Sequence, residues 1–157
     1  MTSATLTPRV DIDIHAPRFG KTMVALDGAT GHGLDPLLVE LVRAHASQIN
    51  GCAYCIDMHS KDGLAKGDTV QRFVSLPAWR ETCYYSDEER AALALTEAMT
   101  LIAEEGVPDE VYAEAAKHFT DEQLAQLIAT VVVVNAWNRI GITTKAYEPG
   151  SYEAARS

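Results

Sequence analysis

The sequence predicts an all-α fold, and three observations carry this prediction. Ser86 and Glu89 have the spacing of a capping box, and so do Thr120 and Gln123. Apolar residues recur at intervals of three and four from residue 34 to residue 144. The alternation that a half-buried strand needs is confined to residues 11–14. We therefore expect helices to build the whole core.

The length of 157 residues fits one domain, since a domain typically takes about 150 residues. A hydrophobic fraction of 47% with 22% charged residues is ordinary for a globular protein that buries a core. We expect a single domain over residues 1–157. It would consist of an N-terminal arm (1–17), a helical core (18–150) and a polar tail (151–157).

The first expected helix follows a stretch with little periodicity. Residues 1–33 carry Gly28, Gly31 and Gly33 and are interpreted as an arm and a loop. Asp35 is a good N-cap and Pro36 suits the first helical position, so a helix is predicted over 36–49. Glycines at 51 and 67 bound a second helix over about 52–66.

The remaining elements follow from caps and breakers. A short helix over about 69–75 should end before Pro77, and residues 77–85 form a connector. A helix that starts after Ser86 continues until Gly106, and Pro108 opens another over 109–118. The last helix is predicted over 121–144. Its four valines at 131–134 permit a strand, but the flanking spacing favours a helix.

Charge and hydropathy exclude several classes of function. Thirteen basic against 22 acidic residues give a net charge of −9, which repels nucleic-acid phosphates. The longest apolar run, residues 127–134, is far shorter than the roughly 20 residues that cross a bilayer. Residues 1–17 lack the basic end and apolar stretch of a signal peptide. We expect no nucleic-acid partner, no membrane span and a cytoplasmic location.

The cysteines indicate a reactive site. Three cysteines are too few for a scaffold held together by disulfides. Cys52 and Cys55 form a CxxC pair. Cys83 has no nearby thiol in the sequence and is interpreted as structural. At about 100° per residue, Cys52, Cys55 and His59 project within a sector of about 60° on one helix. Two thiols so placed can close into a redox disulfide, and the imidazole can accept a thiol proton.

Two physical effects disagree on which thiol attacks. The helix N-terminus favours a thiolate at Cys52, where free N–H groups and the macrodipole act most strongly. His59 lies four residues after Cys55, the closest helical relation between a thiol and a base. The second effect leaves a mild preference for Cys55 as the nucleophile.

Residues 40–59, which read ELVRAHASQINGCAYCIDMH, resemble the core of AhpD-like alkylhydroperoxidases within the carboxymuconolactone decarboxylase superfamily. The resemblance extends through residues 86–98 and 135–139, so that most of residues 18–150 is covered. It implies an all-α fold in trimers or hexamers and a peroxide reductase activity. We expect this activity to need no metal, flavin or haem. The implied partners are a hydroperoxide substrate and a dithiol reductant.

Position by position, the resemblance implies roles for four residues. Cys55 would be the peroxidatic nucleophile and Cys52 the resolving thiol, while Glu40 and His59 would relay a proton. Some family members carry a histidine just before the second cysteine, where this sequence has Tyr54. Because tyrosine is a poor base near neutral pH, Glu40 and His59 must serve without that histidine.

Other interpretations stay open at this point. The pair is also suited to general thiol–disulfide exchange. With His59 it could supply three ligands of a zinc site in a binding or redox-sensing subunit. A purely structural interpretation takes both cysteines as small buried residues. His45 is interpreted as a satisfied core or interface histidine. The polar residues of the last helix are interpreted as structural, making buried hydrogen bonds or subunit contacts: Asn135, Trp137, Asn138 and Arg139.

Overall fold

A computed structural model describes residues 7–154 and has the predicted all-α architecture. Every regular element in that range is helical. In chain order these elements are α1 (Ile12–His15), α2 (Pro17–Gly28), α3 (Pro36–Asn50), α4 (Ala53–Ala65), α5 (Val70–Ser75), the 3₁₀ helix η1 (Leu76–Glu81), α6 (Asp87–Thr100), α7 (Ile102–Glu105), α8 (Asp109–His118) and α9 (Asp121–Thr144).

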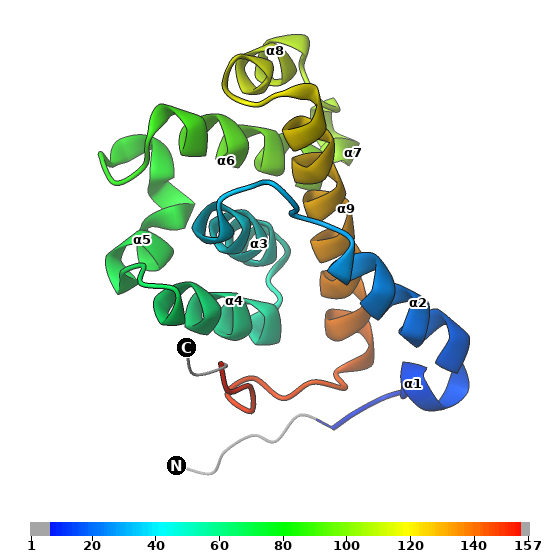
Figure 1. The fold of residues 1–157 in the computed structure, drawn as a ribbon. Coiled ribbons are helices and arrows are strands. Elements are labelled where there is room, and N and C mark those ends of the chain that lie inside the picture. Colours follow the sequence, from blue (N-terminus) through cyan, green and yellow to red (C-terminus); the bar gives the residue numbers. More distant parts are fainter. Residues whose placement is uncertain (1–6, 155–157) are drawn as a thin grey trace.

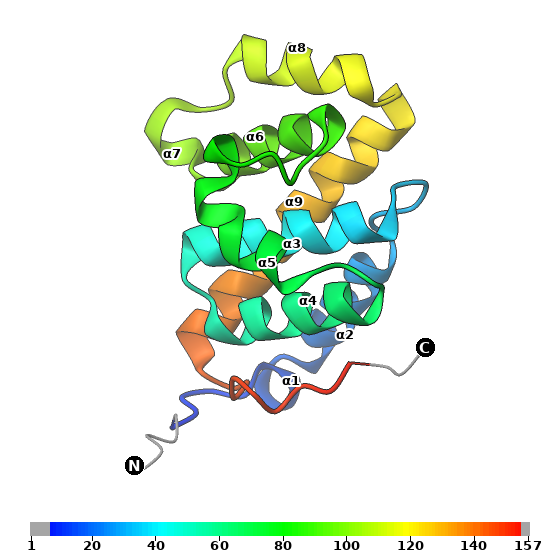
Figure 2. The ribbon, with the colours of Figure 1, turned by 90° about the vertical axis from the view of Figure 1, so that its left-hand side faces the viewer.

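Helix α3 is the centre of the fold. It packs against α4, α6 and α9, and Figure 1 shows it enclosed by these helices and α5. After a quarter turn, α8, α6, α3 and α4 lie one below another while α9 runs obliquely behind them (Figure 2). Leu38 and Val42 of α3 join a core with α6, α8 and α9, whereas Leu41 joins a second core with α5, η1 and α6.

The predicted caps set the helix boundaries. Both capping boxes form, with Ser86 accepting a hydrogen bond from the backbone N–H of Glu89 at α6 and Thr120 from that of Gln123 at α9. Helices α8 and α9 have the predicted bounds, and α9 stays helical through its four valines. Burial of Val131, Val133 and Val134 outweighs the small propensity cost of β-branched residues in a helix.

The prediction of an arm and loop over residues 1–33 is wrong for residues 12–28. Asp11 caps α1 through its side chain, and Pro17 occupies the first turn of α2. Helix α2 buries only Gly20 and Met23, so its apolar periodicity is weak and the sequence did not reveal it. The part of the predicted arm at residues 1–6 lies outside the described range, as do residues 155–157 of the predicted tail.

Two further boundaries differ from the predictions. The helix expected to run to Gly106 breaks at Leu101, whose φ of −94° and ψ of 26° separate α6 from α7. The connector before Ser86 contains the 3₁₀ helix η1, which brings Leu76 and Trp79 into the second core. Neither difference alters the helices that carry the cysteine pair.

Helix α9 is long and apolar enough to cross a bilayer by length and composition, with a hydropathy of 1.3 over its most apolar window. In this fold 39% of that window is buried within the chain. The helix packs against α2, α3, α6 and α8. The core helix of a soluble protein meets the same test of length and composition, so this property is weak evidence for a membrane span.

Candidate functional site

The cysteine pair is placed by a tight turn between α3 and α4. Gly51 ends α3 with a φ of 73°, in the left-handed region that favours glycine. The backbone N–H of Cys52 then donates to the carbonyl of Ser47 at 2.9 Å, which closes the turn. Cys52 becomes the N-cap of α4 and Cys55 lies in its first turn. Both thiols are therefore held at the positive end of this helix.

The two thiols touch each other in a buried environment. Cys52 is 2% and Cys55 4% exposed, and both are free cysteines. Hydrogen bonding from the Cys55 thiol lowers the pKa of Cys52 to about 7, against burial, and the amide of Asn138 contributes further. The same contact, burial and the neighbouring negative charge raise the pKa of Cys55. The pair thus holds one thiolate near neutral pH and retains its second proton.

A pH titration checks this shared ionisation. In a Cys83→Ser background we expect one thiolate to appear with a midpoint near pH 7, because contact with Cys55 lowers the pKa of Cys52 to about 7. The second thiol should keep its proton beyond pH 9.0, the ordinary value for a cysteine. Thiolate absorbance in the ultraviolet measures both steps, with urea-unfolded protein as control. Two thiolates that form together near pH 9.0 in folded protein would contradict the coupling.

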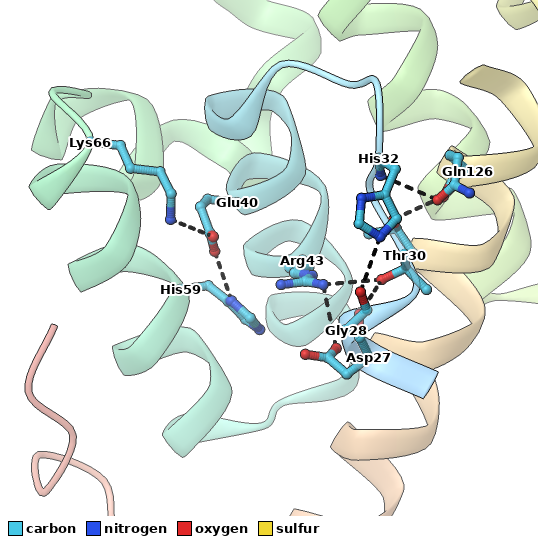
Figure 3. A network of polar contacts seen from close by, with 10 residues as sticks. Asp27, Gly28, Thr30, His32, Glu40, Arg43, His59, Lys66 and Gln126 are labelled. Carbon is cyan, nitrogen blue, oxygen red and sulfur yellow. Dashed lines mark hydrogen bonds and ion pairs between the residues drawn. The ribbon is translucent and has the colours of Figure 1, made fainter. Parts of the chain in front are cut away.

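An ionic chain, buried at Glu40 and His59 and exposed at Lys66, lies beside the pair (Figure 3). His59 Nδ1 contacts Glu40 Oε2 at 2.9 Å, and Lys66 Nζ donates to Glu40 Oε1 at 2.8 Å. Burial raises the pKa of Glu40, but the hydrogen bonds and charges of His59 and Lys66 outweigh it, so the net pKa is lowered. Glu40 is therefore an anion at neutral pH. It orients the His59 ring through Nδ1 and leaves Nε2 without a hydrogen-bond partner among residues 7–154.

One face of the pair opens onto a pocket of about 380 Å³. Cys55 and His59 lie one helical turn apart on α4, and both line this pocket. Cys52 is not part of its wall and borders a separate, smaller pocket of about 170 Å³. A molecule in the larger pocket would therefore meet Cys55 and His59 together.

The C-terminal segment closes the pocket from below α4. Tyr147 stacks on Tyr54 with ring centroids 5.2 Å apart. Tyr152 donates its hydroxyl to Asp62 Oδ1 at 2.7 Å, and the backbone carbonyl of Tyr152 accepts from Lys61 Nζ at 2.8 Å. Tyr54, Tyr147 and Tyr152 all line the pocket. The segment around Tyr147 and Tyr152, which the sequence predicts to be the end of the core and the polar tail, thus forms part of the pocket wall.

The polar residues of α9 serve a structural network, as interpreted. Asn50 Nδ2 contacts the side-chain oxygens of Asn135 and Asn138, each at 2.9 Å, and Asn138 donates to Ser47 Oγ at 3.0 Å. These bonds tie α9 to the end of α3. The interpretation was incomplete for Asn138, which also affects the pKa of both thiols, and for Trp137, which lines the pocket.

A metal ion would find different ligands from those in the zinc hypothesis. Glu40, His59 and Asp62 bring ligand atoms within 4.8 Å of one another, and neither cysteine belongs to this group. Lys66 and Tyr152 already bind two of the three side chains. The cluster nearest to metal-site geometry in the described part of the chain therefore joins His59 to carboxylates rather than to thiols.

Two sequence interpretations need correction. His45 is buried, but its ring nitrogens lack a hydrogen-bond partner within residues 7–154 and its Nε2 stands 3.6 Å from Glu97, so it is not satisfied. Burial lowers the pKa of His45 despite the raising effect of Glu97. Cys83 is exposed rather than packed.

The residues that sequence reasoning missed are Arg43, Asp62 and Lys66, whose partners lie on other elements or well apart along the chain.

Comparison with known proteins places this geometry in a family. The model of the carboxymuconolactone decarboxylase family matches residues 17–98, more than half of the chain, including Glu40, both cysteines of the pair and His59. This chain belongs to that family. The Bacillus subtilis protein YdfG, whose function is uncharacterised, is 41% identical over 138 residues, or 87% of this chain and 94% of YdfG.

Solved structures identify the AhpD-like branch of the family. Protein ATU0492 of Agrobacterium tumefaciens, for which an AhpD-type antioxidant defence role has been suggested, has a TM-score of 0.87 and 33% identity over 91% of this chain and 99% of its own. The debrominase Bmp8 has a TM-score of 0.72 and 19% identity over 84% of this chain and 71% of its own. At 19% identity the likeness to Bmp8 shows the fold alone. The family assignment made from residues 40–59 is confirmed.

Proposed function

We propose that this family member is a thiol-dependent peroxidase of the alkyl hydroperoxide reductase type. One observation carries the proposal: Cys55, in contact with Cys52, shares a pocket with a histidine that a buried carboxylate orients. A nucleophile, a base and a group that orients the base are the parts of an activated thiol. The second thiol within reach supplies the means to complete a redox cycle.

The first step oxidises Cys55. While Cys52 is protonated, as it is in a substantial share of the molecules at a pKa of about 7, His59 accepts the Cys55 proton, and the Cys55 thiolate attacks the terminal oxygen of a hydroperoxide in the pocket. The O–O bond breaks, the sulfur becomes a sulfenic acid, and the proton on His59 passes to the departing alkoxide, which leaves as an alcohol. Glu40 stabilises the charged imidazole between these transfers, as an anion held by Lys66.

The second step closes the pair. Cys52 attacks the sulfenic sulfur of Cys55, a disulfide forms, and the hydroxyl leaves as water with the Cys52 proton. An external dithiol then reduces the disulfide by two thiol exchanges and is itself oxidised. The contact between the thiols favours this step because no large movement is needed to join them. No metal, flavin or haem enters the cycle.

The cellular setting follows from the same chemistry. The pair must be reduced after every turnover, and the cytoplasm keeps thiols reduced, so we place the protein there.

We also propose a homo-oligomer, a trimer or a hexamer. Exposed apolar side chains on α2 and α9, two helices that contact each other, support self-association: Phe19, Val24, Leu26, Val132 and Ile142.

Peroxide turnover tests the proposed function. Reduced protein given one equivalent of cumene hydroperoxide should yield cumyl alcohol and a Cys52–Cys55 disulfide, seen as a loss of two hydrogens by mass spectrometry. Dithiothreitol and dihydrolipoamide should then sustain turnover. A pair that reduces an added disulfide substrate but leaves the hydroperoxide intact would instead indicate a general thiol–disulfide oxidoreductase. Absence of both the disulfide and sulfenic acid would refute the peroxidase.

A further inference from the structure

The pocket over Cys55 combines apolar walls with one largely buried cation. Val134, Trp137 and Met58 contribute apolar surface, and Arg43 of α3 lines the same space as His59. The Arg43 side chain is only 15% exposed. Figure 3 shows its guanidinium between His59 and Thr30. The peroxidase cycle described above assigns no role to this cation, although a desolvated arginine in a pocket is well suited to bind an anion.

The partners of Arg43 occupy only one end of its guanidinium. Nη2 donates to Asp27 Oδ1 at 3.3 Å and to Thr30 Oγ1 at 3.2 Å. Within residues 7–154, Nε and Nη1 donate to no other group. A carboxylate binds arginine best through two parallel N–H donors. Each two-nitrogen fork of a guanidinium includes Nη2, so a ligand carboxylate would pair Nη2 with Nη1 or Nε and displace the Asp27 contact, which at 3.3 Å is at the long end of the hydrogen-bond range.

The other charges around the pocket are already engaged. Asp62, which lines the pocket together with Asp27, accepts a hydrogen bond from the Tyr152 hydroxyl. Glu40 is bound by His59 and Lys66. The side chain of Asp27 is 39% exposed, so water screens its negative charge. Apart from the imidazole of His59, Arg43 is thus the one basic side chain of the pocket wall in the described chain.

The size of the pocket also points to an organic ligand. A water molecule takes about 30 Å³ of liquid volume, and hydrogen peroxide is larger by only one oxygen atom. A pocket of about 380 Å³ is therefore several times larger than hydrogen peroxide requires. Apolar walls favour a hydrocarbon body. We propose that this chain selects organic hydroperoxides that carry a carboxylate, with Arg43 binding the carboxylate while the peroxide group meets Cys55. This inference rests on the proposed function and names its substrate class.

Binding tests the anion site without any peroxide chemistry. Calorimetry would compare 4-isopropylbenzoate with its methyl ester, which lacks the negative charge and carries one more methyl group. We expect the acid to bind at least about tenfold more tightly, and Arg43→Gln to remove that preference. Asp27→Asn should tighten binding of the acid, because a competing carboxylate is gone. Arg18 is an exposed arginine outside the pocket wall, so Arg18→Gln makes the same charge change as Arg43→Gln at a distant position. It should alter the affinity for neither the acid nor the ester.

Kinetics with the matching hydroperoxides completes the test. The para-carboxylate of cumene hydroperoxide should exceed its methyl ester in kcat/KM by roughly tenfold, and Arg43→Gln should bring the ratio near one. Equal binding of acid and ester, or an acid preference that persists in Arg43→Gln, would overturn the inference. If Arg43 selects the benzoate but neither hydroperoxide is reduced, the anion site stands and the peroxidase proposal fails. Circular dichroism of each variant verifies folding.

Discussion

Replacement of Cys55 by serine should abolish peroxide turnover, with a fall of roughly a thousandfold or more in kcat/KM, because serine supplies no thiolate to attack the peroxide. Replacement of Cys52 should also stop multiple turnover, but for a different reason. Cys55 would still react once, and its sulfenic acid would persist because no second thiol lies beside it to expel water. The two variants therefore distinguish attack from resolution.

Rapid mixing with one equivalent of cumene hydroperoxide separates these outcomes. Cys52→Ser should consume about one equivalent and become trappable by dimedone at Cys55, whereas Cys55→Ser should consume none. Cys83→Ser is the matched control, because Cys83 is exposed and lies outside both pockets that border the pair. A Cys55→Ser protein that still reacts, with dimedone found on Cys52, would reverse the two roles. That result has a physical basis in the lowered pKa of Cys52.

Glu40→Gln should lower kcat by roughly a hundredfold, the usual contribution of general acid–base catalysis. Glutamine can still accept a hydrogen bond from His59, so the ring keeps its place. It lacks the negative charge that stabilises the imidazole when it carries the Cys55 proton. Glu40 is a positioning residue that acts through His59, and its loss should change kcat far more than KM for cumene hydroperoxide.

A second substitution separates catalysis from stability. Glu40→Gln leaves Lys66 without its partner, although Lys66 is 39% exposed and can turn toward water. Adding Lys66→Met should restore any loss in Tm but not in kcat. Glu114→Gln, on the exposed face of α8, is the control and should leave both quantities unchanged. Recovery of kcat in the double variant would mean that Glu40 matters only for folding.

The sequence by itself determined the features that depend on near neighbours along the chain. Capping residues placed the starts of α6 and α9, and helical periodicity put Cys55 and His59 on one face of α4. The resemblance carried by residues 40–59 indicated the family and added Glu40, which local periodicity alone would leave as a solvated carboxylate. These inferences held because positions three or four apart on a helix meet whatever the rest of the fold does.

Only the tertiary structure decided which distant groups meet the cysteine pair. Lys66 reaches Glu40 across 26 positions, and Tyr152 reaches Asp62 across 90, because α3 packs on α4 and the C-terminal segment runs beneath it. Helix α2, which brings Asp27 to Arg43, has too weak an apolar pattern to be seen without the α9 surface on which it packs. Contacts of this kind depend on the packing of whole helices, which the pattern within one segment does not specify.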